Sequence, residues 1–218
     1  GVAMITFIYS ITNTSAAVTL LCLAAMPFFT AILAYLFLKE KISINVWVSI
    51  FIASVGIIIM AIGNTEKNSL IGFLFGLASS IGFSVFSVSL RWRKETPKFT
   101  TVAVAGLFCF VFATVMILVT NQSFFASSYN SSMFSLHGTL VCLGLILYSI
   151  GSKAIPAAEL TLLSLTEVIG GIFWVWLPLF GINEVPSINT IIGGFFLFVS
   201  LIYYSLVMRW NKRYIALN

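Results

Sequence analysis

Long apolar runs separated by short polar turns dominate the sequence. A membrane-spanning helix needs about 20 mostly apolar residues. After an apolar stub at about residues 1–12, seven runs approach or exceed this length, at about 15–38, 44–62, 70–90, 99–120, 136–154, 157–180 and 188–208. Spanning strands would instead alternate over about ten residues. The pattern therefore predicts an all-α integral membrane protein, a multi-helix bundle of about seven full helices plus a stub.

The composition narrows the range of chemistry. Of 218 residues, 60% are hydrophobic and 8% are charged, whereas about a quarter of the residues in a soluble domain are charged. The chain has no Asp and a single His, His137, so it lacks the ligand sets of metal-dependent hydrolases and the Asp pair of aspartyl proteases. It also lacks a nucleotide-binding segment. We therefore expect no enzyme activity, no catalytic residue, no metal site and no cofactor.

The positive charges predict how the chain is oriented. Of the eleven Lys and Arg residues, all except Lys67 fall at turns or ends on one side of the predicted bundle. Cytoplasmic loops of membrane proteins are enriched in Lys and Arg, so this side and the C-terminus are predicted to be cytoplasmic. The net charge of +5 then reflects topology, and we expect no nucleic-acid partner.

Two stretches of the chain resemble each other at a constant offset of 144 residues. EKISINVWVSIF (40–51) aligns with EVPSINTIIGGF (184–195), with five identities in twelve positions. The predicted spans that precede them are an odd number of crossings apart, so the second copy enters the membrane in the opposite sense. Inverted repeats of this kind build many secondary transporters. We predict two inverted five-helix repeats, the first incomplete (residues 1–64) and the second complete with a short cytoplasmic tail (65–218).

The aligned segments also resemble a known family. SAAVTLLCLAAMPFFTAILAYLFLKEKIS, PAAELTLLSLTEVIGGIFWVWLPLFGINEVPS and the closing IIGGFFLFVS are similar to the EamA domains of the drug/metabolite transporter (DMT) superfamily. The resemblance implies a ten-helix bundle, usually in a bacterial cytoplasmic (inner) membrane, that moves small metabolites. Compared with that pattern, the N-terminal helices of the first repeat are missing, so the chain looks cut at its N-terminus.

Glu167 is the candidate centre of the site. It stands about ten residues into an apolar run, or about 15 Å along a helix that rises 1.5 Å per residue. A carboxylate at that depth is costly and usually faces a water-filled cavity or a partner. Ser164, Glu167, Gly171 and Trp174 share one helix face, which predicts a substrate or proton pathway. Alternatively, Glu167 is a protonated carboxyl bonded between helices, and Trp174 approaches the outer membrane interface.

Two further features concern how the helices bend and pack. Pro27 removes a helix hydrogen bond and is predicted to be either a hinge or a static kink. Gly72, Gly76, Ser80 and Ser84 recur every four residues. Small residues allow helices to approach closely in lipid, so we predict that this stripe is a close-packing face, with a hydroxyl-lined pathway as the alternative.

The leading functional hypothesis is a secondary transporter that moves a small metabolite or drug-like solute across the membrane by alternating access, with efflux coupled to protons or another gradient. The expected partners are the solute and the lipid bilayer. The alternatives are a non-transporting membrane scaffold or channel-like protein, and a half-assembly that needs a partner chain. A homodimer is one form of such an assembly.

Overall fold

The computed structural model describes residues 1–63, 70–92, 95–121, 123–124, 127–177 and 188–216. Within these ranges the secondary structure is helical and contains no strand, as the apolar runs predicted. The first half comprises α1 (Val2–Asn13), α2 (Ala16–Ala24), α3 (Met26–Leu33), the π-helix η1 (Ala34–Leu38) and α4 (Ile44–Gly63). The second half comprises α5 (Leu70–Trp92), α6 (Lys98–Val119), α7 (Ser128–Gly151), α8 (Ala157–Leu163), α9 (Leu165–Trp176) and α10 (Ile188–Ala216).

Four stretches of the described chain are long and apolar enough to cross a membrane: 18–38, which contains most of α2 and all of α3 and η1, and 70–92, 99–119 and 128–151. Shorter apolar helices cover residues 2–13, 44–59 and 191–207. The remaining predicted span, 157–180, is divided into α8 and α9. The chain is an all-α integral membrane protein.

Two helices are longer than the predicted spans. The span predicted at about 136–154 begins earlier, because α7 starts at Ser128, where the Ser127 side chain accepts a hydrogen bond from the Asn130 amide. Such a cap stabilises a helix start despite the polar sequence that follows. At the other end of the chain, α10 continues to Ala216, so most of the expected cytoplasmic tail is helical.

Two helices are interrupted at similar places. One interruption is at Ala25, between α2 and α3, and the other is at Ser164, between α8 and α9. The two residues have nearly the same backbone conformation, with φ −77° and ψ −8° at Ala25 and φ −67° and ψ −9° at Ser164. The broken helices pack against each other in a crosswise pairing, α2 on α9 and α3 on α8. The N-terminal part of each broken helix therefore contacts the C-terminal part of the other broken helix.

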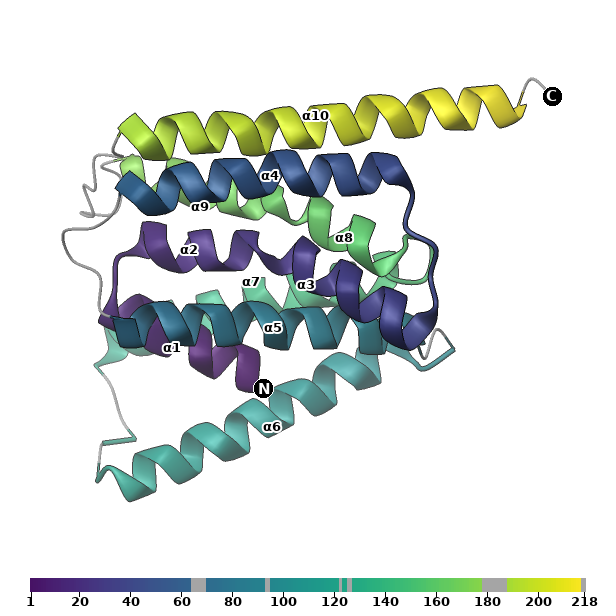
Figure 1. Cartoon of the computed structure of the whole chain (residues 1–218). Helices are drawn as coiled ribbons and strands as arrows, with labels where there is room; N and C mark the ends of the chain where they lie inside the picture. Colours follow the sequence, from purple (N-terminus) through teal and green to yellow (C-terminus); the bar gives the residue numbers. More distant parts are fainter. Residues whose placement is uncertain (64–69, 93–94, 122, 125–126, 178–187, 217–218) are drawn as a thin grey trace.

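The contact between α4 and α10 is reciprocal. The two helices lie side by side (Figure 1). The Ser200 hydroxyl donates to the Ser49 carbonyl oxygen at 2.7 Å, and a Cβ atom placed on Gly56 would lie 2.6 Å from the Gly193 carbonyl oxygen. At the repeat offset of 144, Ser49 corresponds to Gly193 and Gly56 to Ser200. Two copies of one surface related by a two-fold axis produce this pattern of exchanged contacts.

The small-residue stripe of α5 is a close-packing face, as predicted. Its four members, Gly72, Gly76, Ser80 and Ser84, are all buried. A Cβ atom on Gly72 would meet Thr14, and one on Gly76 would meet Cys22 and Ser10 at less than 3 Å. Ser79 adds a hydrogen bond to the Ala3 carbonyl oxygen at 2.8 Å. The stripe therefore joins α5 to α1 and α2.

Helices α6 and α7 lie at the margin of the bundle. In Figure 1, α6 runs below α5 at an angle to it. Among the described side chains of α6, only Val102 is buried, and α7 buries only Ser149. The main packing partner of α7 among the described elements is α6. These helices expose large apolar side chains over most of their length.

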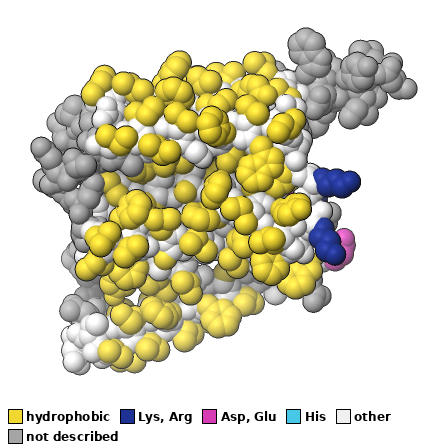
Figure 2. Space-filling model, in the orientation of Figure 1, with side chains coloured by type: hydrophobic (Ala, Val, Ile, Leu, Met, Phe, Trp, Pro, Cys, Tyr) yellow, Lys and Arg dark blue, Asp and Glu magenta, His cyan; other side chains and the backbone are white. Residues whose placement is uncertain are grey.

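The described Lys and Arg side chains gather at one end of the molecule (Figure 2). Figure 2 shows an almost continuous hydrophobic face, with Lys, Arg and acidic side chains only at one edge. We call this edge the cationic end. It contains the η1–α4 and α7–α8 connections, with Lys39, Lys41, Arg91 and Lys153 among its described residues. A belt of apolar side chains with charges at one edge is the arrangement expected of a bundle surrounded by lipid.

Candidate functional site

A cavity of about 430 Å³ lies beside Glu167. Its walls come from α1, α2, α3, α5, α7 and the junction of α8 and α9. Both predicted repeats therefore contribute, the first through α1, α2 and α3. The volume falls toward the lower end of the range common for small-molecule pockets, about 300–1,000 Å³.

Glu167 is exposed and lines this cavity together with Ser164. The structure places Glu167 in the first turn of α9 rather than in mid-helix, and its amide donates to the Ser164 carbonyl oxygen at 2.9 Å. The first turn of a helix carries partial positive charge that stabilises a carboxylate. The break at Ser164 thus places an acid about 15 Å along an apolar segment at a helix start, where partial positive charge offsets part of the cost of apolar surroundings.

The local sequence explains the break at Ser164. Its hydroxyl donates to the Thr161 carbonyl oxygen at 2.7 Å, and the Thr161 hydroxyl bonds in turn to the Ala157 and Ala158 carbonyl oxygens. Hydroxyl groups that bond to the preceding turn compete with backbone hydrogen bonds and bend helices. The hydroxyl residues of TLLSLT were therefore the available sequence signal for this break.

The other described carboxylates have different environments. The Glu40 carboxylate accepts a hydrogen bond from Arg91, and that of Glu159 accepts one from the Tyr204 hydroxyl. Glu95 is exposed between α5 and α6. No described residue forms a hydrogen bond or an ion pair with the Glu167 side chain. Of these acids, Glu167 alone combines a cavity with an unbonded carboxylate.

The remaining predicted pathway residues do not line this cavity. A Cβ atom on Gly171 would lie 2.9 Å from Leu20 Cδ1, so Gly171 faces α2 at close range. Trp174 is 54% exposed near the end of α9. The cavity therefore brings together Ser164 and Glu167, whereas Gly171 and Trp174 lie further along α9. Substrate contact remains a prediction for all four residues.

Pro27 is buried in the first turn of α3, two residues after the break at Ala25. Proline lacks the amide hydrogen that would bond to the carbonyl group four residues earlier, and its ring clashes with that carbonyl group. Its presence thus accounts for an interruption in the turn that precedes it. Movement about this point, the predicted hinge, remains a prediction.

Sequence reasoning missed most of the cavity wall. Tyr148 and His137 of α7 are its further titratable residues. The Glu167 carboxylate lies close enough to the Tyr148 phenol for a Coulomb interaction. Met4, Phe7 and Phe83 add apolar surface. These residues belong to three helices far apart in the sequence, and no local pattern indicated that they meet.

Tyr148 also takes part in closing the space between α5 and α7. Its hydroxyl shares a hydrogen bond with that of Ser87, and its ring stacks on Phe86 with a centroid distance of 6.4 Å. Tyr148 lies near the C-terminal end of α7, which leads to the cationic end. We expect this contact to restrict passage between the cavity and that end.

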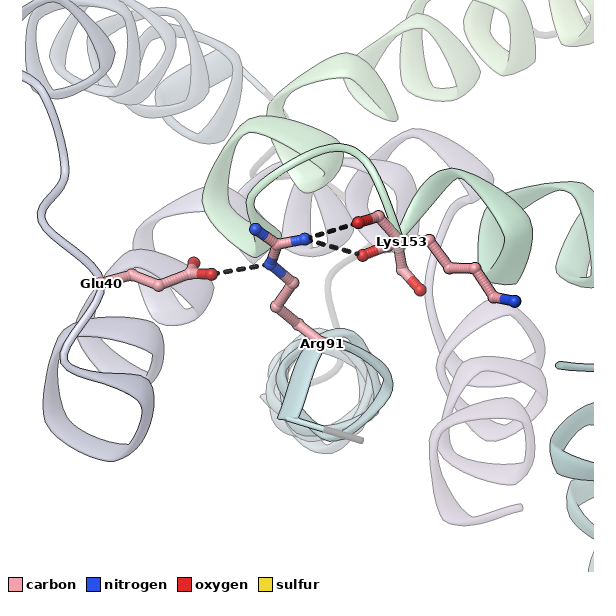
Figure 3. A network of polar contacts seen from close by, with 4 residues as sticks. Glu40, Arg91 and Lys153 are labelled. Carbon is pink, nitrogen blue, oxygen red and sulfur yellow. Dashed lines mark hydrogen bonds and ion pairs between the residues drawn. The ribbon is translucent and has the colours of Figure 1, made fainter. Parts of the chain in front are cut away.

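Arg91 ties together three segments at the cationic end (Figure 3). Its Nε donates to Glu40 Oε1 at 2.7 Å, and its Nη1 donates to the carbonyl oxygens of Ser152 at 3.3 Å and Lys153 at 2.9 Å. A guanidinium group suits this role because it presents several donors in fixed geometry. We call this set the Arg91 clamp. It connects the end of α5, the residues before α4 and the α7–α8 connection.

The described residues contain no group of three or more His, Cys, Asp or Glu side chains arranged to hold a metal ion. The arrangement around Glu167 offers a carboxylate, hydroxyl groups and apolar surface. Chemically, it can bind a small solute that has both polar and apolar parts, or accept and release a proton.

Comparison with known proteins supports the resemblance seen in the sequence. Residues 1–62 match the model of the EamA-like transporter family. We call these residues, which are similar to that family, the EamA-like segment. The chain is also similar to two curated proteins of Helicobacter pylori, from strains J99 and 26695, each described as an uncharacterized transporter. Each is 30% identical over 95 residues, which cover 44% of this chain and 32% of the relative.

The EamA-like segment contains α1 to η1 and nearly all of α4. It therefore includes the break at Ala25, Pro27 and the cavity residues of α1, α2 and α3. The aligned part spans about a third of the length of these relatives. Assignment of residues 65–218 to a second repeat remains a prediction.

Proposed function

We propose that the protein is a secondary transporter that moves a small metabolite or drug-like solute through the bilayer by alternating access. The observation that carries this proposal is the 430 Å³ cavity beside Glu167, with walls from both predicted repeats. Substrate sites of transporters with inverted repeats lie where the repeats meet, and interrupted helices often form them. The breaks at Ala25 and Ser164 and the EamA-like segment support the same function.

Glu167 is the proposed coupling group. A carboxylate that lines a cavity without a bonded partner can alternate between a proton and a solute. Tyr148 and His137, both on α7, are the other titratable side chains among the described residues of the cavity wall. A proton gradient directed into the cell then drives efflux of the solute. In this proposal the cationic end faces the cytoplasm of a bacterial cell.

Flux measurements test the transport function. The 218-residue chain is reconstituted in liposomes loaded with a mixture of isotope-labelled amines, amino acids, alcohols and organic acids. Release is followed by mass spectrometry with and without an imposed pH gradient. We expect at least one solute to leave faster than from protein-free liposomes, and the gradient to accelerate its release. Equal release from both kinds of liposome for every solute would contradict the proposal.

The role of Glu167 is tested with Glu167→Gln, which keeps the size of the side chain but cannot exchange a proton. We expect this variant to lose acceleration by the pH gradient. The matched control is Glu95→Gln, which makes the same change at an exposed position outside the cavity. Wild-type flux with unchanged pH dependence in Glu167→Gln would exclude this carboxylate as the coupling group.

The position of α7 favours a second candidate, a half-assembly completed by another chain. α7 forms one wall of the cavity, yet its main packing partner among the described elements is the marginal helix α6. A second copy that covers this wall would make the active form a homodimer. Native mass spectrometry of the reconstituted protein distinguishes the candidates, because a monomer active in flux contradicts the half-assembly.

A further inference from the structure

The charge balance of the cavity indicates which solute it holds. Among the described residues that line the cavity, Glu167 is the only carboxylate, and no described side chain neutralises it. By contrast, the Arg91 guanidinium pairs with Glu40 outside the cavity. A lone carboxylate in mostly apolar surroundings binds a cation more favourably than a neutral or anionic group. The cavity is therefore suited to a solute with a positive charge.

The hydroxyl groups beside Glu167 favour a cation that donates hydrogen bonds. Ser164 already donates its hydroxyl hydrogen to the Thr161 carbonyl oxygen, so its oxygen is left to accept. The Tyr148 oxygen, joined to Ser87, can accept a second hydrogen bond. Together with the Glu167 carboxylate, these oxygens suit a primary ammonium group, which has three donors and no acceptor. A quaternary ammonium group would leave the acceptors unused.

The rest of the wall is apolar. Met4 and Phe7 of α1, Met26 of α3 and Phe83 of α5 contribute much of it. Flexible Met side chains beside aromatic rings adapt to aromatic or aliphatic groups of varied shape. The wall therefore fits an apolar body attached to the ammonium group.

The placement of His137 distinguishes an amine from an amino acid. His137 also lines the cavity, but it lies eleven residues before Tyr148 on α7, about 16 Å away at 1.5 Å per residue. The ammonium and carboxylate groups of an α-amino acid are separated by a single carbon. Such a solute, held at Glu167 beside Tyr148, would bring its own carboxylate close to Glu167 and out of reach of His137. Repulsion between the two carboxylates would weaken its binding.

We infer that the cavity binds a small amphipathic primary amine, with its ammonium group at Glu167 and its apolar body against α1, α3 and α5. This inference rests on the proposed transport function, since it names the solute class for the same cavity. The observations behind it are the unpaired carboxylate, the neighbouring acceptors and the apolar remainder of the wall.

Binding of three matched probes to the full chain in lipid nanodiscs tests this inference. The probes are 2-phenylethylamine, 2-phenylethanol and phenylalanine, which share a phenyl ring and differ in charge. We expect the amine to bind at least about tenfold more tightly than either other probe, because hydrogen bonds to a charged group are stronger than neutral ones. Equal or tighter binding of the alcohol or the amino acid would overturn the inference, as would no binding of the amine.

Two cavity variants test separately the charge of Glu167 and the free volume of the cavity. Glu167→Gln removes the charge, and we expect it to abolish the preference for the amine, whereas Glu95→Gln retains it. Gly144 lines the cavity, and a Cβ atom there would meet nothing within 4 Å. Gly144→Leu should therefore fill the cavity without a clash and weaken amine binding at least about tenfold, while Gly106→Leu, also in open space on α6, should not. Amine binding unchanged by both cavity variants would place the amine elsewhere.

Comparison of binding with flux shows which proposal fails. Preference for the amine at Glu167 without flux of any solute would support the ligand class and contradict transport. Flux of neutral or anionic solutes in preference to amines would support transport and contradict the ligand class.

Discussion

The α4–α10 pair and the α6–α7 pair are both apolar, yet they pack in opposite ways. α4 and α10 approach so closely that a Cβ atom on Gly56 would overlap the Gly193 carbonyl oxygen. In α6 and α7, Gly106, Gly138 and Gly144 have nothing within 4 Å of such an atom. The same residue type is therefore essential at one contact and unconstrained at the other.

Hydropathy does not explain which helices are buried at the centre of the bundle and which lie at its margin. α6 has the highest mean hydropathy of the four long candidate spans, 2.8, and only 6% of that stretch is buried in the protein. α5 has a mean hydropathy of 1.9 and is 39% buried. Lipid tails are as apolar as leucine, so hydrophobicity alone does not drive helices together inside a membrane. Small residues that permit close packing, as on α5, determine which helices lie at the centre.

Of the three stability variants, we expect Gly56→Leu to lower the free energy of unfolding the most. The added side chain would meet the backbone of α10, and the helices would have to separate. We expect a loss of about 3 kcal/mol in the free energy of unfolding, the upper part of the usual range for overpacking. Denaturant titration in detergent micelles measures it. The control is Gly106→Leu, which should change stability by less than about 1 kcal/mol. A similar loss in both variants would show that α4–α10 packing is not the cause.

Arg91→Gln tests how the marginal helix α7 is held. The change removes the ion pair with Glu40 and weakens the contacts with the carbonyl oxygens that follow α7. Hydrogen bonds to charged groups contribute about 1.5–3 kcal/mol, so we expect a loss of about 2 kcal/mol and faster hydrogen exchange at the C-terminal end of α7.

The matched control is Lys153→Gln, which removes the same charge from an exposed side chain but keeps the carbonyl oxygen that Arg91 uses. We expect this control to lie within about 0.5 kcal/mol of wild type. If α7 exchanges at the wild-type rate in Arg91→Gln, the Arg91 clamp does not hold that helix.

Of the three stability variants, we expect Ser200→Ala to lower the free energy of unfolding the least. It tests how much a hydrogen bond contributes to the α4–α10 contact. It deletes the hydrogen bond to the Ser49 carbonyl oxygen but keeps the close approach of α4 and α10. Hydrogen bonds between membrane helices average about 0.6 kcal/mol, and we expect a loss of that size in the same titration. Ser135→Ala on exposed α7 is the control. A loss as large as that of Gly56→Leu would mean that the hydrogen bond, rather than close packing, holds the pair.

The amino-acid sequence was sufficient to predict an all-α membrane protein, because lipid imposes a length and an apolar composition on every spanning segment. It also predicted the close-packing stripe of α5, which the structure confirms. The resemblance to EamA domains is confirmed by the family match over residues 1–62. At the candidate site it predicted that Glu167 and Ser164 share a face, and both line the cavity. Their functional roles remain predictions.

The surroundings of Glu167, by contrast, depend on how distant helices pack. The break at Ser164 places the acid at the start of a helix, and α7 brings Tyr148 and His137 into the same wall. The same structure turns Gly171 toward Leu20 instead. Helical periodicity predicts which residues share a face, but the partner of that face depends on how distant helices cross. That crossing is set by small residues in several segments at once, and no single stretch of sequence contains it.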